Sequence, residues 1–238
     1  MNDKIIDLSW DSEFFGFPVS KIENVTLSKT FLKSVHLNCK AKLIYYYNDE
    51  ALDEKLFDNS FYEVKLVDIK VPLKKVLDKE TNIHPNISFY QETEAGKELI
   101  ELAQIAGVHT RFNIDGNIPK VKYRDLFTEW IERSVKKEIA DFILVYKINN
   151  KIVGFAIIDI RQNSPYISLF AVHPDYEGKG ISFALMRAIE NKLRDWGYKE
   201  VFGATQQVNR KALVVYERYG LKRLPSQYVY HLWKRDNL

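Results

Sequence analysis

The chain of 238 residues contains a single cysteine, Cys39, so it has no second cysteine for an internal disulfide. This usage is typical of a reducing compartment, and Cys39 lies in an apolar stretch where a buried thiol is the expected role. No apolar run approaches the ~20 residues that a membrane-spanning helix needs, and the first residues lack the apolar segment of a signal peptide. These absences predict a soluble cytoplasmic protein with no membrane partner.

Glycine and proline are also sparse, at 10 and 7 residues, which argues against long disordered or low-complexity segments. The net charge of +3 is too small to indicate a nucleic-acid partner, although it is compatible with an anionic ligand. The composition, 46% hydrophobic and 28% charged, is that of a globular protein of one large or two small domains. No metal-ligand cluster and no Ser-His-Asp arrangement stands out, so we expect no metal and no covalent acyl-enzyme.

The most informative stretch runs from residue 166 to residue 220. A β-rich run over residues 166–172 leads to a turn with two glycines, Gly178 and Gly180, and a helical run follows. The helical run places its apolar residues on one face: Ile181, Leu185, Ala188, Ile189, Leu193 and Trp196. Backbone N–H groups at a glycine turn that opens a helix form a binding site for an anion such as phosphate.

A Gly-x-Gly turn taken alone is compatible with several kinds of site. A dinucleotide-binding turn would place a third glycine at Phe183, and a P-loop would place Lys-Ser or Lys-Thr where Ile181 and Ser182 stand. A purely structural turn between a strand and a helix would also use two glycines. The segment that follows favours anion binding, because it adds a strand over residues 200–205 and a helix that starts at Asn209 and ends at Gly220.

This order of elements resembles the Gcn5-related N-acetyltransferase (GNAT) superfamily. The shared features are the glycine turn at residues 177–182 and the pattern Asn-x-x-Ala-x-x-x-Tyr, which reads Asn209, Ala212 and Tyr216 here. The resemblance implies an α/β fold with a central mixed, mostly antiparallel sheet, whose central strands splay apart and which helices flank. It also implies acetyl-CoA as co-substrate and transfer of its acetyl group to an amine by direct attack.

The resemblance carries a set of coenzyme-binding residues over to this chain. The turn would hold the pyrophosphate through its backbone, and the strand before it would align the pantetheine arm through main-chain groups. The residues so assigned are Leu169, Phe170, Ala171, Val172, Glu177, Gly178, Lys179, Gly180, Ile181, Ser182, Asn209, Ala212 and Tyr216. Glu177 stands where the family has Gln or Arg, and Ser182 replaces a smaller residue, so we expect weakened or rearranged coenzyme binding rather than its loss.

Tyr216 is the general acid that the resemblance implies, because a phenol with a pKa of about 10 is protonated at neutral pH. A buried aromatic on an amphipathic helix is the alternative role, and Tyr219 is the rival acid. His109 is a candidate general base, with a chain of water molecules as the alternative, whereas we expect His173 to be structural.

The N-terminal segment over residues 8–19 is dense in aromatic residues. Its aromatic content alone would predict a turn that packs into the core. The segment also resembles the start of the TDP-fucosamine (dTDP-4-amino-4,6-dideoxygalactose) N-acetyltransferase subgroup of GNAT enzymes. The loop at Arg111 and Phe112 and the helical run that holds Trp130 resemble the same subgroup, which implies these three residues in acceptor binding. Arg111 would meet an anionic group of a nucleotide sugar, with a surface ion pair as the alternative.

We expect two domains: a small α/β N-terminal subdomain over residues 1–84 and an acetyltransferase domain over residues 85–238. The boundary is placed in the polar, proline-containing segment of residues 81–86. Periodicity predicts strands at 5–10, 41–47, 62–71, 87–91, 142–148, 152–160, 166–172, 200–205 and 227–234. It predicts helices at 28–39, 51–57, 95–105, 123–134, 181–196 and 209–219.

Three hypotheses about function remain open at this point. The first is an N-acetyltransferase for the amino sugar of a nucleotide-linked sugar, and the second is a GNAT enzyme for another amine, such as a protein N-terminus, an amino acid or a polyamine. The third is a non-catalytic acyl-CoA-binding module. The expected partner is a small-molecule amine, and a homodimer is left open.

Overall fold

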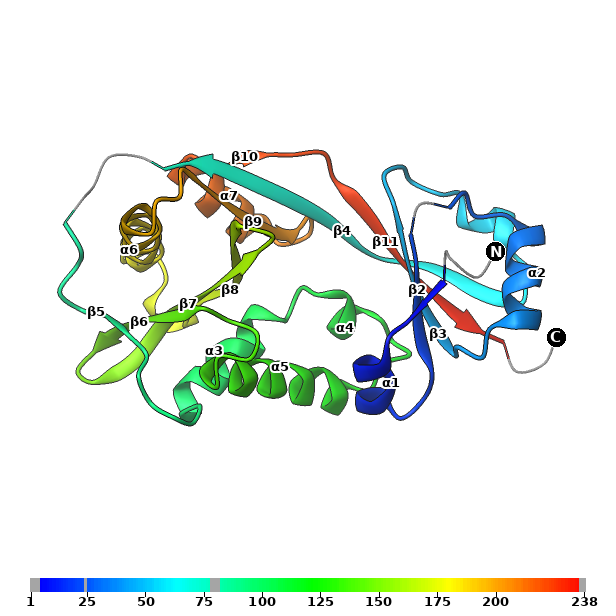
Figure 1. Cartoon of the computed structure of the whole chain (residues 1–238), viewed down its shortest axis with the longest axis horizontal. Coiled ribbons are helices and arrows are strands. Elements are labelled where there is room, and N and C mark those ends of the chain that lie inside the picture. The colour runs from blue at the N-terminus through cyan, green and yellow to red at the C-terminus, as the bar shows by residue number, and fades with distance from the viewer. Residues whose placement is uncertain (1–4, 24, 78–81, 236–238) are drawn as a thin grey trace. The chain divides into compact units, whose positions relative to one another are not determined.

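The computed structural model describes residues 5–23, 25–77 and 82–235, which group into two compact units. The first unit contains the chain up to Lys70 together with the segment from Pro225 onward, and the second contains Val71–Leu224. The strand labelled β4, Tyr62–Val76, passes through both (Figure 1). The division into domains at residues 84 and 85 stays a prediction, whereas the contacts divide the chain near residues 70 and 225.

The first unit is a five-stranded sheet in the order β1-β2-β3-β11-β4. Strands β2 and β3 are parallel, and the other neighbours are antiparallel. Its elements besides β4 are β1 Ile5–Asp7, α1 Ser9–Phe15, β2 Val19–Ile22, α2 Lys29–Asn38, β3 Leu43–Asn48, the 3-10 helix η2 Glu54–Phe57 and β11 Gln227–Lys234. The last strand of the chain therefore lies in the first unit, between two strands that come early in the sequence.

Helix α2 covers one face of this sheet. It starts at Ser28, whose hydroxyl accepts a hydrogen bond from the Phe31 N–H at 3.1 Å, and its apolar residues Leu32 and Val35 are buried. They pack in one core with strand residues that include Tyr46 and Tyr230. The predicted helix over residues 28–39 and the predicted strand over residues 227–234 are both confirmed.

The start of the chain differs from its prediction as a single strand over residues 5–10. Strand β1 ends at Asp7, and helix α1 begins at Ser9. The Ser12 hydroxyl donates to the Leu8 carbonyl at 2.7 Å and accepts from the Val19 N–H at 2.8 Å, so the aromatic segment folds back on itself. Gly16, at φ +78°, ends the helix in the left-handed conformation.

The second unit contains the other half of β4 and most of the helices. Its remaining elements are β5 Ile87–Phe89, α3 Lys97–Ala106, α4 Arg111–Ile114, α5 Lys120–Val135, β6 Phe142–Ile148, β7 Lys151–Arg161, β8 Ser164–Val172, the 3-10 helix η3 Pro174–Tyr176, α6 Ile181–Asp195, β9 Glu200–Gln206, α7 Arg210–Tyr219 and β10 Lys222–Arg223. The strand order is β4-β9-β8-β7-β6-β5, with β10 paired to β4. Strands β8 and β9 are parallel, and α6 makes the connection between them.

Helices cover both faces of the second unit's sheet. Helices α6 and α7 pack on one face, in a core that contains Leu185, Ile189 and Tyr216, and α3 and α5 pack on the other, in a core that contains Leu102 and Ile131. Figure 1 shows α6 on one side of β6–β8 and the pair α3 and α5 on the other. A mixed sheet with helices on both faces is the fold class that the sequence predicted. Within the described residues, no helix is long and apolar enough to cross a membrane.

Candidate active site

The glycine turn predicted from the sequence joins η3 to α6 in the second unit. Gly178 has φ +74° and Gly180 has φ +76°, a conformation that side-chain-bearing residues rarely adopt. A Cβ atom built on either glycine meets no other atom within 4 Å, so the space over the turn is open. Glycine is therefore favoured at both positions by the positive φ angles of the turn. Because an added Cβ would meet no neighbouring atom there, packing does not require glycine.

The N–H groups of this turn are available to a ligand. Within the described residues, the N–H groups of residues 178–183 donate no hydrogen bond, and the first occupied one is that of Ala184, which donates to the Gly180 carbonyl at 3.0 Å. No side chain caps α6. Because these N–H groups lie at the positive end of a 15-residue helix, they suit an anion with several oxygens, such as a diphosphate.

The parallel strands β8 and β9 separate next to this turn. Their pairing is confined to Tyr166 with Phe202 and Ile167 with Gly203. On the other side of β8, Leu169 pairs with Ile157 and Ile167 pairs with Ile158, so Ser168 is an extra residue that forms a β-bulge. The part of β8 that follows, with Leu169, Phe170, Ala171 and Val172, stays on β7 and leaves β9, which produces the splayed central strands expected of the fold.

Helix α7 brings Tyr216 to the splayed part of β8. The centroid of the Tyr216 ring lies 6.2 Å from that of Phe170, and the side chain is buried in the core under α6. Burial raises the pKa of the Tyr216 phenol well above its ordinary value, since the charged form loses its hydration. The phenol therefore stays protonated at neutral and moderately alkaline pH and can donate a proton or a hydrogen bond.

The start of α7 holds the other two predicted residues of this motif. The Asn209 side-chain oxygen accepts a hydrogen bond from the Ala212 N–H at 3.2 Å, which makes Asn209 the N-cap of the helix. Ala212 packs against the core of the α6 face. Gly220, at φ +101°, ends the helix, so the cap and the stop both lie where the sequence predicted them. A coenzyme contact for Asn209 or Ala212 stays a prediction.

Charged side chains flank the turn. Glu177 pairs with Lys211 of α7, with 2.8 Å between Oε2 and Nζ. The Lys179 ammonium lies 4.6 Å from the centroid of the Tyr176 ring and donates to the Asp175 carbonyl at 3.3 Å. His173 accepts a hydrogen bond from the Asp175 N–H at 3.3 Å, and its structural role stays a prediction. The contact between Glu177 and Lys211 was not visible in the sequence, because 34 residues separate them.

The predicted acceptor residues lie together at α4 and α5. Phe112 is buried, and its ring meets that of Trp130 edge to face with 5.8 Å between centroids. The Arg111 guanidinium lies 4.3 Å from the centroid of the Phe112 ring, and His109 is half-buried in the turn between α3 and α4. The structure thus groups these four residues on one segment, while their roles in acceptor binding and proton transfer stay predictions.

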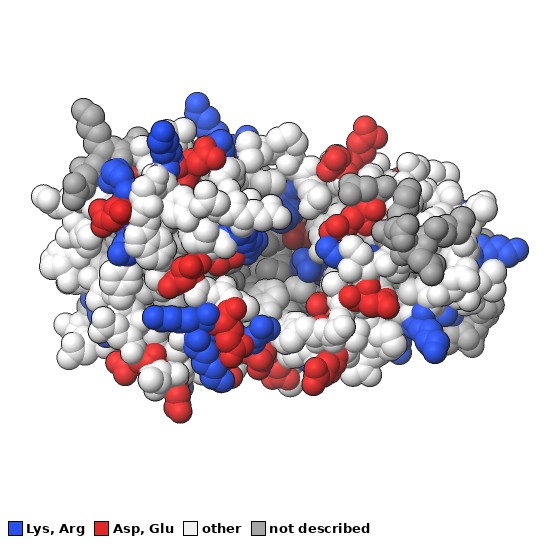
Figure 2. Space-filling model, viewed as in Figure 1, with Lys and Arg blue, Asp and Glu red and all other residues white. Residues whose placement is uncertain are grey.

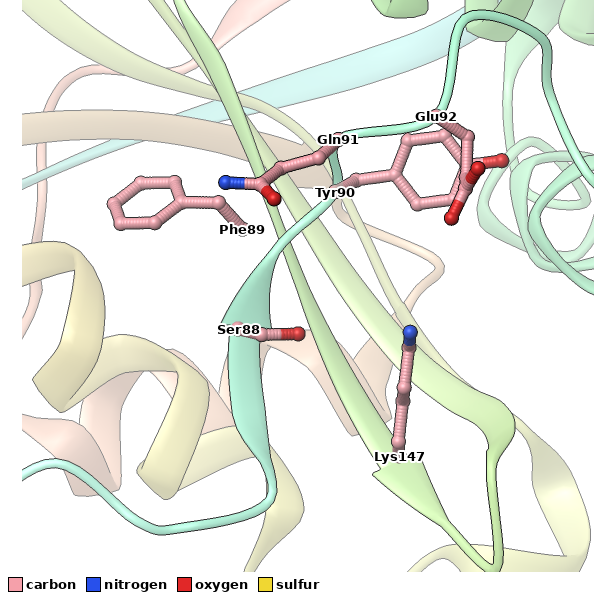
Figure 3. Close-up of a pocket in the computed structure, with 6 residues that line it drawn as sticks. All are labelled: Ser88, Phe89, Tyr90, Gln91, Glu92 and Lys147. Atoms are coloured by element: carbon pink, nitrogen blue, oxygen red, sulfur yellow. The ribbon is translucent and has the colours of Figure 1, made fainter.

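Two surface depressions are lined by none of the predicted site residues. One, of about 360 Å³, is lined by residues 88–92 and Lys147, at the edge strand β5 (Figure 3). The other, of about 850 Å³, lies in the first unit beside α1 and Cys39. Acidic and basic side chains are interspersed over the described residues of the face drawn in Figure 2. The described residues contain no cluster of His, Cys, Asp and Glu that could hold a metal ion.

Residues 108–221 match the acetyltransferase (GNAT) family, and this segment contains the glycine turn, the splayed strands and Tyr216. The segment is therefore similar in sequence to GNAT acetyltransferases. The members of this family use acetyl-CoA, and the open glycine turn with its free N–H groups fits the diphosphate of that coenzyme.

Two named proteins illustrate the relatives of the chain. It is 30% identical over 142 residues to the spore coat polysaccharide biosynthesis protein SpsD of Bacillus subtilis (strain 168), a match that covers 60% of this chain and 48% of SpsD. It is 26% identical over 111 residues to N-alpha-acetyltransferase 30 of Schizosaccharomyces pombe, covering 44% of this chain and 74% of that protein. The chain therefore spans about half the length of SpsD.

Solved structures share the fold. A functionally unknown conserved protein from Staphylococcus epidermidis superposes with a TM-score of 0.62 at 13% identity, over 98% of this chain and 92% of that one. A GCN5-related N-acetyltransferase from Sphaerobacter thermophilus gives a TM-score of 0.52 at 17% identity, over 82% of this chain and 61% of that one. The first of these covers both compact units, so the fold of nearly the whole chain recurs in another protein.

Proposed function

We propose that this protein is an acetyl-CoA-dependent N-acetyltransferase that acetylates a primary amine by direct attack. The observation that carries the proposal is the glycine turn, whose free N–H groups at the start of α6 lie next to the point where β8 leaves β9. A diphosphate on the turn and an extended arm along β8 would place a thioester near Tyr216. Bound acetyl-CoA supplies the acetyl carbonyl that the amine attacks, and coenzyme A leaves as the thiol.

The residues of this chain have separate tasks in the proposed reaction. The turn N–H groups at residues 178–183 bind the diphosphate, and the main chain of Leu169, Phe170, Ala171 and Val172 aligns the arm as a neighbouring strand would. Alignment of two reactants can lower a barrier by up to roughly 7–11 kcal/mol, which exceeds the usual contribution of one acid or base. Tyr216 donates the proton that the sulfur receives when the carbon–sulfur bond breaks.

The amine must lose a proton as it attacks. His109 is a side chain of suitable chemistry on the segment proposed to bind the acceptor, residues 109–130, and a chain of water molecules is the alternative route to solvent. The two differ in their pH dependence. A side-chain base that takes up a proton loses activity as the pH falls, whereas a water chain leaves only the titration of the amine itself.

For the acceptor we propose the amino sugar of a nucleotide-linked sugar, of the dTDP-4-amino-4,6-dideoxygalactose kind. The aromatic segment at residues 8–19 and the loop at Arg111 support it, together with the similarity to SpsD, whose name places it in polysaccharide biosynthesis. In this proposal Arg111 binds a phosphate of the sugar nucleotide, while Phe112 and Trp130 hold the loop in place.

The α-amine of a protein N-terminus is the second candidate acceptor. It is favoured by the similarity to N-alpha-acetyltransferase 30 over the acetyltransferase region. A non-catalytic coenzyme-binding module would not need a buried phenol beside β8, so the position of Tyr216 supports an enzyme over such a module.

A screen for thiol release tests the proposal directly. The protein is incubated with acetyl-CoA and with one acceptor at a time: dTDP- and UDP-amino sugars, peptides with free N-termini, and polyamines. We expect release with a dTDP-amino sugar and only background release with the other amines. Release with peptides alone would move the function to the second candidate, and no release together with no thermal stabilisation by acetyl-CoA would overturn the enzyme proposal.

A further inference from the structure

Glu177 places a carboxylate directly before the first glycine of the turn. The N–H groups of the turn attract anions, whereas a negative side chain beside them repels a diphosphate. The Glu177 carboxylate is paired, however, with 2.8 Å between its Oε2 and the Lys211 ammonium. Lys211 is the second residue of α7, so the pair connects the turn to the helix that carries Tyr216.

The lysine within the turn itself is directed elsewhere. Lys179 donates to the Asp175 carbonyl and lies over the Tyr176 ring, both on the segment before the turn. Within the described residues, Glu177 forms its ion pair with Lys211. The Lys211 side chain is 82% exposed and Glu177 is 45% exposed, so the pair itself adds little to the stability of the fold.

We propose that Lys211 sets the affinity of the turn for the coenzyme by neutralising Glu177. The inference rests on the proposed function, in which this turn binds the diphosphate of acetyl-CoA. Without the ammonium of Lys211, the carboxylate would face two phosphate charges across a short distance at the surface. With it, the turn presents its N–H groups beside a neutral pair.

The test measures binding of coenzyme A by isothermal titration calorimetry at low ionic strength, with no reaction involved. Lys211→Met keeps the aliphatic stem and removes the charge, and we expect coenzyme A to bind about three- to ten-fold more weakly. The control is Lys199→Met, which makes the same change of net charge at an exposed lysine beyond the other end of α6. It should bind within about two-fold of the unmodified protein.

Two further measurements identify the cause. In the Glu177→Gln background no carboxylate needs to be neutralised, so Lys211→Met should then weaken binding by less than about two-fold. Dephospho-coenzyme A lacks the 3′-phosphate but keeps the diphosphate, so it should show the same loss with Lys211→Met as coenzyme A does. Added salt should reduce the loss, because both partners are exposed.

The outcomes separate this inference from the proposed function. If the unmodified protein binds coenzyme A and Lys211→Met binds it equally well, the inference is wrong and the function stands. A loss that persists in the Glu177→Gln background, or that is absent with dephospho-coenzyme A, would also overturn the inference, because the effect would then not arise from Glu177 beside the diphosphate. If the unmodified protein does not bind coenzyme A, both proposals fail.

Discussion

Tyr216 combines two properties that matter for an acid. Its ring is packed against Phe170 and within the core under α6, which fixes its position. Burial raises its pKa, so that the phenol keeps its proton over the pH range in which most enzymes work. A raised pKa also makes the phenol a weaker acid, so the proposed proton transfer requires a thiolate whose own basicity is raised by burial beside Tyr216.

Replacement of Tyr216 by phenylalanine tests this role. We expect Tyr216→Phe to lower kcat by about 100-fold, because it removes the proton donor and keeps the ring. The affinity for coenzyme A should change by less than about two-fold, since the packing against Phe170 is retained. Steady-state kinetics with the acceptor found in the screen and calorimetry with coenzyme A give the two values.

Tyr219→Phe is the matched control for this prediction. Tyr219 is on the same helix three residues later, and its ring contacts that of Phe183 at 5.3 Å between centroids. We expect Tyr219→Phe to leave kcat nearly unchanged. A large loss with Tyr219→Phe and none with Tyr216→Phe would assign the acid to Tyr219.

Single residues of the site differ in how well the sequence could place them. Gly178 and Gly180 were predictable, because a turn between a strand and a helix at this spacing needs left-handed backbone, and both glycines have it. Asn209 was predictable as a helix start for a similar local reason. Lys211 was not, since its partner Glu177 lies far along the chain and an exposed lysine on a helix has no local signature.

At the scale of elements, α3 and α5 are held together by a contact that requires a glycine. Gly107 ends α3, and a Cβ built on it would lie 2.3 Å from Cε2 of Phe127, a fully buried residue of α5. The backbone of Gly107 is in an ordinary region, at φ −83°, so only the close approach demands glycine here. The segment proposed to bind the acceptor, residues 109–130, begins directly after this contact.

Gly107→Ala should therefore destabilise the protein. The added methyl group must displace the Phe127 ring or separate the two helices, and we expect the free energy of unfolding to fall by about 1–3 kcal/mol. Urea unfolding followed by circular dichroism measures the change. Gly116→Ala is the control, because a Cβ at Gly116 meets nothing within 4 Å, and a similar loss in both variants would contradict the role of the Phe127 contact.

Long elements with a clear period were predicted well, and short ones were not. Strand β6 has the predicted bounds of residues 142–148, and the hairpin that follows it uses Asn149 and Asn150 at positive φ, as expected for a tight turn. Helix α4 has only four residues and was expected as a loop, and β2 and β10 were missed. The bulge at Ser168 had no signal either, because it depends on which residues of β7 face β8.

At the scale of the whole molecule, buried tyrosines occur in both compact units. Tyr62 lies in the first unit and Tyr216 in the second, and burial raises the pKa of each well above its ordinary value. In the unfolded chain the same phenols have a pKa of about 10. Their contribution to stability is therefore fully present below pH 10 and is lost as the pH rises above it, since the unfolded chain then releases protons that the folded protein retains.

The protein should consequently lose stability steeply in alkali. Each such tyrosine lowers the free energy of unfolding by about 1.4 kcal/mol per pH unit above about pH 10. Urea unfolding at a series of pH values gives the slope. In Tyr62→Phe, whose hydroxyl has no hydrogen-bond partner among the described residues, we expect a shallower slope and little loss of stability at neutral pH. An unchanged slope would show that Tyr62 does not contribute.

The arrangement of the whole chain was predicted in class but not in detail. The α/β fold with a mixed sheet and splayed strands was implied by the resemblance of its motifs to the GNAT superfamily. The final strand was expected to pair into the sheet, and it does so between β3 and β4, within the first unit. Its alternation of side chains fixes a strand but not its neighbours, which depend on contacts between residues far apart in the chain.

The short pairing of β8 with β9 has a consequence for how this protein can diverge. Hydrogen bonds made by main-chain donors and acceptors do not depend on the identity of the side chains of the strand that supplies them. Substitutions at Leu169 or Ala171 can therefore accumulate, as long as packing is kept, without erasing the proposed coenzyme contacts. Proline is the exception, because it deletes a donor outright, so lineages of this chain should vary widely over residues 169–172 of β8 while avoiding that one residue there.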